Sequence, residues 1–178
     1  MRIFFAILVL LFIASASFAG PFGTEMADPV EKYKNIHFLG SKYGIDNFAT
    51  STMPQVAKPF VGYQLCFHER KLIGVAAFSQ NGPIMDTQQL FQRLYSCLSE
   101  KYGRETLKLK RFVHWVASQS SPLPDNLSSI KLVYGEQNGN FSVHVYFDYR
   151  NAEHLKDRIR ADKQLQLEKM KRAFESSP

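Results

Sequence analysis

The strongest constraint on the fold is an alternation of side chains in FVGYQLCFH, residues 60–68. Apolar residues alternate with smaller or polar ones: the apolar set is Val61, Tyr63, Leu65 and Phe67, and the other set is Gly62, Gln64, Cys66 and His68. A period of two predicts a β-strand with one buried face. Glu69, Arg70 and Lys71 follow as a polar turn, and residues 72–78 return as a more buried run. The sequence therefore predicts a β-hairpin here.

A helix is predicted directly after this hairpin. Asp86 is a suitable N-cap, with Gln89 at the capping-box position, and Gly103 provides the stop signal. Between them the apolar residues recur at helical spacing: Leu90, Phe91, Leu94, Tyr95 and Leu98.

A second hairpin is predicted by EQNGN, because Asn-Gly stands between the alternating runs 130–135 and 141–149. Asn151 is expected to cap a long polar helix that continues to about Phe174.

Three other segments carry weaker signals. Asp28, Pro29 and Glu31 favour a short helix to about Asn35, and residues 48–52 hold at most a short strand. Residues 106–117, TLKLKRFVHWVA, are ambiguous, since they alternate at the start like a strand but also place apolar side chains on one helical face. We expect a helix there.

The predicted elements form two hairpin–helix units, residues 60–102 and 129–174. This pattern indicates an α+β class: one domain over residues 20–178, with an antiparallel sheet and helices mainly on one of its faces. At this length the chain can bury a real core.

The first 19 residues are typical of a signal peptide. Arg2 precedes an apolar run at residues 3–13, and small residues at Ser17 and Ala19 predict cleavage between Ala19 and Gly20. The run is shorter than the ~20 residues that cross a bilayer. We therefore expect an exported protein, periplasmic or secreted, with no transmembrane segment after cleavage. Sequons at Asn126 and Asn140 leave a secreted eukaryotic protein open.

The two cysteines, Cys66 and Cys97, are expected to pair, because exported proteins meet an oxidising compartment. Such a disulfide closes a loop of about 30 residues and contributes on the order of 3–4 kcal/mol. The pairing requires the helix to cover the Cys66 side of the sheet. If the helix covers the Tyr63 and Leu65 side instead, the sheet separates the two sulfurs.

The same Cys66 lies two residues before His68, which raises the possibility of a nucleophile with its base. Side chains at i and i+2 of a strand stand roughly 6–7 Å apart, beyond the hydrogen-bond reach of about 3 Å. No metal-ligand array, phosphate loop or GxSxG motif occurs in the chain. We expect no metal, no cofactor and no catalysis, with a small hydrolase using His68 or His144 as the alternative.

The formal charge of +6 falls to +5 without residues 1–19, because Arg2 is the charged residue among them. This excess suits an anionic surface but is too dispersed for nucleic-acid binding. The candidate partner surface is Tyr146 on the last strand with Arg158, Lys169 and Arg172 on the terminal helix. Its partner would be another envelope protein or an anionic envelope surface; the alternative is a solvated helix face supported by ion pairs.

The expected mature start, GPFGTEMADPVEKY, resembles small exported bacterial proteins of unknown function that open Phe-Gly-x-x-Met before a short helix. FVGYQLCFHERKLIGVAAFS, LFQRLYSCLSEKYG, LPDNLSSIKL and VYFDYRNAEHL are similar to later pieces, in the same order. This chain departs from them at Ala27, where they have Gly. The resemblance implies an envelope location and no catalytic residues, so the role expected is a non-enzymatic binding or envelope-associated module.

Overall fold

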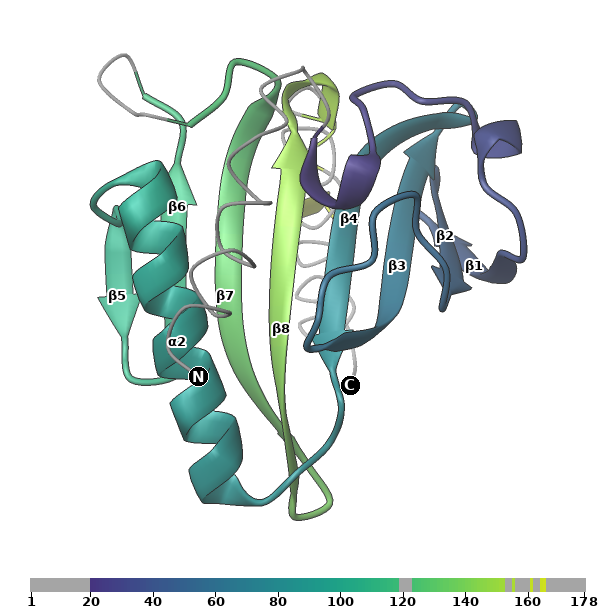
Figure 1. The fold of residues 1–178 in the computed structure, drawn as a ribbon. Helices are drawn as coiled ribbons and strands as arrows, with labels where there is room; N and C mark the ends of the chain where they lie inside the picture. The colour runs from purple at the N-terminus through teal and green to yellow at the C-terminus, as the bar shows by residue number, and fades with distance from the viewer. Residues whose placement is uncertain (1–19, 119–122, 153–154, 156–160, 162–163, 166–178) are drawn as a thin grey trace, which may run out of the picture.

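The computed structural model describes residues 20–118, 123–152, 155, 161 and 164–165, and these form one large sheet with a helix against it (Figure 1). The strands are β1 (His37–Lys42), β2 (Ile45–Thr50), β3 (Phe60–His68), β4 (Lys71–Ser79), β5 (Leu107–Leu109), β6 (Phe112–Val116), β7 (Leu127–Gln137) and β8 (Asn140–Tyr149). Helix α2 (Ile84–Tyr102) connects β4 to β5, and three short 3₁₀ turns lie at Pro21–Gly23, Val30–Lys32 and Arg150–Ala152.

The sheet consists of two antiparallel meanders joined at one seam. Its strand order is β1-β2-β3-β4-β8-β7-β6-β5. Strands that follow each other in the chain are neighbours throughout, except at the seam, where β4 pairs with β8. Because both meanders begin at the outside, β1 and β5 are the two edges of the sheet.

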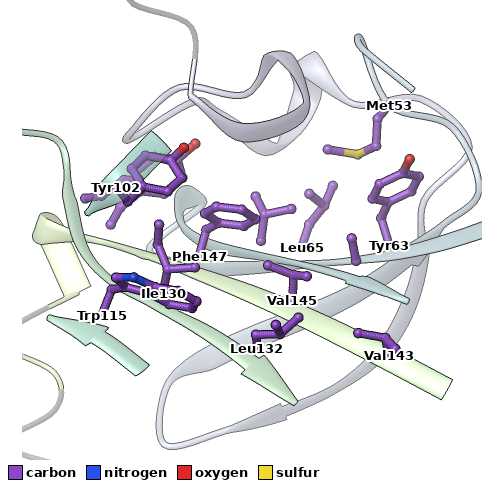
Figure 2. Packing of buried hydrophobic residues seen from close by; sticks show 14 of the residues in the cluster. Met53, Tyr63, Leu65, Tyr102, Trp115, Ile130, Leu132, Val143, Val145 and Phe147 are labelled. Atoms are coloured by element: carbon purple, nitrogen blue, oxygen red, sulfur yellow. The ribbon is translucent and has the colours of Figure 1, made fainter. Parts of the chain in front are cut away.

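The core lies on one face of the sheet, which we call the helix face. Alternate residues of the central strands point into it, including Tyr63, Leu65, Val145 and Phe147 (Figure 2). Helix α2 packs against this face over β7 and β8 through Leu90, Phe91, Leu94, Tyr95 and Leu98. Phe22, Tyr33 and Met53, from the segments that precede β1 and β3, contribute to the same core. Three separate segments of the chain thus cover one face.

The turns follow the local chemistry of the sequence. Glu69 and Arg70 both have positive φ between β3 and β4, as do Asn138 and Gly139 between β7 and β8. Two successive residues with positive φ make a type I′ turn, whose twist matches the strands that it joins. Both predicted hairpins are therefore present, and α2 ends at Gly103 as expected.

The predicted arrangement of two hairpin–helix units in an α+β domain is wrong. Within the described part of the chain, the structure has eight strands and a single α-helix, α2. Residues 106–117 are the hairpin β5–β6 and not a helix, because β6 pairs along its length with β7. The helix expected to continue to Phe174 lies largely outside the described residues.

The N-terminal segments also differ from expectation. The short helix expected from Asp28 is reduced to the 3₁₀ turn Val30–Lys32, since the Asp28 carboxylate instead accepts hydrogen bonds from the Glu25 backbone and from the Lys32 and Tyr33 side chains. The strand expected at 48–52 is β2, which starts three residues earlier and pairs with the unpredicted β1.

Candidate functional site

The face of the sheet opposite α2 carries most of the residues that the sequence singled out, and we call it the polar face. Asn47, Cys66, Gly74, Asp148 and Ser129 follow one another in register across β2, β3, β4, β8 and β7. The central residues of β4 on this face are small, so side chains from β3 and β8 approach each other across it. Figure 1 shows this face behind the sheet as drawn.

Cys66 is held in a network that suppresses its reactivity. Its Sγ donates to Asn47 Oδ1 at 3.3 Å, and the same oxygen accepts a 2.8 Å bond from Gln64 Nε2. Burial, with the charge of Asp148, raises the pKa of the thiol to about 11. A thiol with such a pKa stays protonated at neutral pH and is a poor nucleophile.

His68 contacts the Gly44 carbonyl and the Glu69 side chain. Its Nδ1 is 2.8 Å from the Gly44 carbonyl oxygen, and its Nε2 is 3.8 Å from Glu69 Oε1. The ring is therefore directed toward the β1–β2 turn. The expectation that Cys66 and His68 are not a catalytic pair stays a prediction.

The predicted disulfide is not formed in this structure, where Cys66 and Cys97 are free cysteines. Cys66 packs on the polar face beside Ile45, Ile73, Ala152 and Leu155. Cys97 is exposed on α2, which covers the helix face, so the sheet lies between the two. An intramolecular bond would require a different placement of α2.

His144 on β8 has a defined set of neighbours. Its Nε2 is 2.8 Å from Ser142 Oγ, and its Nδ1 is 3.3 Å from the Tyr146 hydroxyl. The Phe78 ring packs edge-on against the imidazole, with centroids 4.9 Å apart. Burial lowers the pKa of His144, which favours the neutral ring near pH 7.

The β5–β6 hairpin forms a second candidate site at the far edge of the sheet. Leu109 lies opposite Phe112 and Leu107 opposite His114, so these side chains share the polar face with Val116. Lys108 points to the other side, where its Nζ lies 3.6 Å from the centre of the Tyr95 ring. We call Leu107, Leu109, Phe112 and Val116 the hairpin patch.

Basic residues lie close to the hairpin patch in the sequence. Residues 101–111 contain five exposed basic side chains, Lys101, Arg104, Lys108, Lys110 and Arg111. Glu105 is the acid in that stretch, which gives a net charge of +4. Arg111 is paired with Glu136 at 3.0 Å. The sequence contained this signal as Leu-Lys-Leu-Lys, but the helical interpretation of 106–117 concealed it.

Only part of the predicted partner surface can be placed. Tyr146 is half-buried on the polar face, where its hydroxyl contacts His144 instead of projecting outward. Arg158, Lys169 and Arg172 lie outside the described residues, as does Ala19 of the predicted cleavage site. Gly20 is described and packs against the Tyr149 hydroxyl.

The described residues carry neither a metal-ligand cluster nor a membrane-spanning helix. They contain no cluster of three or more His, Cys, Asp or Glu side chains able to hold a metal ion. None of their helices has the length and hydropathy needed to cross a membrane.

No protein-family model matches this chain, and neither a curated protein nor a solved structure matches it. The resemblance to exported proteins that open Phe-Gly-x-x-Met therefore stays a prediction. Any proposal of function rests on the two sites described above, the hairpin patch and the surroundings of His144.

Proposed function

We propose that the protein is an exported, envelope-associated binding module that docks on an anionic lipid surface through the hairpin patch. The observation that carries this proposal is the exposure of apolar side chains within a cationic stretch. Leu107, Leu109 and Val116 are 45%, 57% and 38% exposed, and the stretch of residues 101–111 carries a net charge of +4, within which Arg111 is paired with Glu136.

The apolar and the basic side chains of this surface have different physical roles. Exposed leucines beside basic residues are the composition of interfacial segments, which bury apolar side chains at the level of the lipid headgroups. A lysine or arginine near an anionic membrane contributes about 1 kcal/mol. That electrostatic part is screened by salt, over a Debye length of about 10 Å at 0.1 M. The docking should therefore weaken as ionic strength rises.

The opposite edge of the sheet fits this role less well. Phe38 and Leu39 on β1 are each 60% exposed, so the apolar component is present there too. In residues 37–50, however, the positive charge of Lys42 is balanced by the negative charge of Asp46, so the net formal charge is zero. The β1 edge lacks the cations that would attract a lipid headgroup, and it provides a matched control.

Co-sedimentation with lipid vesicles tests the proposal. The protein should bind vesicles of phosphatidylglycerol and phosphatidylethanolamine, and bind phosphatidylcholine vesicles far less. Lys110→Glu changes the local charge by two, which at about 1 kcal/mol per charge predicts binding roughly 30-fold weaker. Leu109→Ser should weaken binding to a smaller extent by removing an apolar contact.

The matched variants Lys42→Glu and Leu39→Ser on β1 should leave vesicle binding close to that of the unaltered protein. Equal losses from both edges would show a nonspecific charge effect and contradict docking through the hairpin patch. Absence of binding to anionic vesicles at low salt would refute the lipid surface, and a protein partner would then be sought for the same patch.

A further inference from the structure

A surface pocket of about 520 Å³ lies beside the β7–β8 turn. Phe78, Asn81, Gly135, Glu136, Ser142 and His144 are among the residues that line it. This volume lies within the range of about 300–1,000 Å³ typical of small-molecule sites. The pocket joins an aromatic wall to several hydrogen-bonding groups.

The imidazole of His144 is fitted into the wall of this pocket. Gly135 lies opposite Ser142 in the β7–β8 ladder, and a Cβ at position 135 would come within 3.3 Å of His144 Cε1 and 3.4 Å of its Nε2. Because Gly135 has no side chain, the imidazole has room to lie there. The Phe78 edge contacts the same ring from β4.

The hydrogen bonds of His144 connect three side chains of β8 in a row. When Nδ1 carries the proton and donates to the Tyr146 oxygen, Nε2 can accept from the Ser142 hydroxyl, 2.8 Å away. This order of nucleophile, base and orienting group is the one that activates a serine. Burial lowers the pKa of His144 and raises that of Tyr146, so at pH 7 the ring is neutral and the phenol keeps its proton.

We propose that Ser142 is a catalytic nucleophile, activated by His144 and positioned through Tyr146, in a site that hydrolyses small esters. Ser142 Oγ attacks the ester carbonyl carbon while its proton passes to His144 Nε2. The C–O bond of the ester then breaks, and the leaving alcohol takes that proton. Water, deprotonated by the same nitrogen, cleaves the acyl-serine to release a carboxylic acid and restore Ser142.

The lining of the pocket determines which esters fit. Phe78 offers an apolar wall for an acyl group, and the Asn81 amide is a donor that can stabilise the oxyanion. Glu136 also lines the pocket, and its carboxylate is paired with Arg111 at 3.0 Å. Three titratable side chains lie near His144 in this part of the sheet: Tyr146, Glu136 and Lys131. Lys131, on β7, is paired with Asp148 at 2.7 Å.

The direct test is covalent labelling with a fluorophosphonate. Ser142 Oγ should displace fluoride from phosphorus and retain the phosphonyl group, which peptide mass spectrometry locates. Ser142→Ala should abolish the label. Ser96→Ala, at an exposed serine of α2, should leave it unchanged. Failure of the unaltered protein to label at Ser142, or labelling at another residue only, overturns the proposal.

Hydrolysis of p-nitrophenyl acetate supplies the kinetic test. His144→Gln should lower kcat/KM by about 10²–10⁴-fold, the usual contribution of a general base. Tyr146→Phe should retain turnover but move the midpoint of the pH–rate profile, which a purely structural role would not do. Ser142→Ala with an unchanged rate refutes the site even if vesicle binding is normal, because the two sites share no residue.

Discussion

The hydrogen bond between Thr24 and Tyr149 ties the N-terminal segment to β8, and its loss should have a measurable cost. Both residues are fully buried, and their hydroxyl oxygens are 2.6 Å apart. Thr24 Oγ1 donates its proton to the Pro21 carbonyl at 2.6 Å, so Tyr149 is the donor to Thr24. Tyr149→Phe removes that donor and leaves the Thr24–Pro21 bond in place.

The expected magnitude follows from this geometry. A buried hydrogen bond contributes about 1 kcal/mol to the free energy of unfolding. For a domain of this size, that loss lowers Tm by roughly 2–4 °C. Thr24→Val should cost more, about 1–3 kcal/mol, because it leaves the buried Tyr149 hydroxyl without its acceptor, while the Pro21 carbonyl keeps only its bond from the backbone N–H of residue 24. The double variant should cost less than the two single losses together.

Urea unfolding followed by tryptophan fluorescence measures these losses. Trp115 is the single tryptophan of the chain, is 2% exposed, and donates from Nε1 to the Gly103 carbonyl at 3.0 Å. Tyr95→Phe is the control, since its bonds to Glu105 are longer, at 3.3 and 3.4 Å, and only partly buried. An unchanged midpoint for Tyr149→Phe, or additive losses in the double variant, would refute the reasoning.

Three further predictions concern single side chains. Burial lowers the pKa of His144 below its unfolded value, so the unfolded chain binds the proton more readily and stability falls as the pH drops below about 6.5. His144→Gln should therefore flatten the change in urea midpoint between pH 7 and 5. A variant with the same pH dependence as the unaltered protein would count against this reasoning. Without reduction at pH 8, iodoacetamide should label exposed Cys97 and spare Cys66, whose pKa is about 11; no label before reduction and two after it would instead establish the disulfide. Gly139→Ala should cost about 1–2 kcal/mol in urea unfolding, because φ is +75° there, and an unchanged midpoint would contradict this.

The elements that could be predicted are those whose signal is local. β3 and β4 show a period of two or a continuous apolar run, and α2 shows a helical period with a glycine at its end. Asn138 and Gly139 specify their turn by backbone preference alone. In each case neighbouring residues determine the structure, so no knowledge of distant partners is needed.

The elements that were missed depend on distant partners. Leu109, Phe112 and Val116 fall on one face of a helix but also on one face of a hairpin, and pairing of β6 with β7 decides between the two. β1 is short, exposed and interrupted by a bulge near Gly40, so it has no apolar alternation to detect. Such strands exist because the sheet beside them provides hydrogen-bonding partners.

The surroundings of His144 show where spacing rules reach their limit. The argument that separated Cys66 from His68 used the distance between side chains at i and i+2 of a strand. At Ser142 and His144 the same spacing allows a 2.8 Å contact, because the imidazole turns along the strand over Gly135. Side-chain direction, which depends on neighbouring strands, is not contained in the spacing.

The seam between β4 and β8 has a consequence for assembly. Within each meander, every strand pairs with a strand that is its neighbour in the chain. The 19-residue helix α2 connects the two meanders. Nothing in the seam itself requires that its two strands belong to one molecule. An exchange of halves between two copies would keep every strand pair of the sheet and would require only that the connection between β4 and α2 opens.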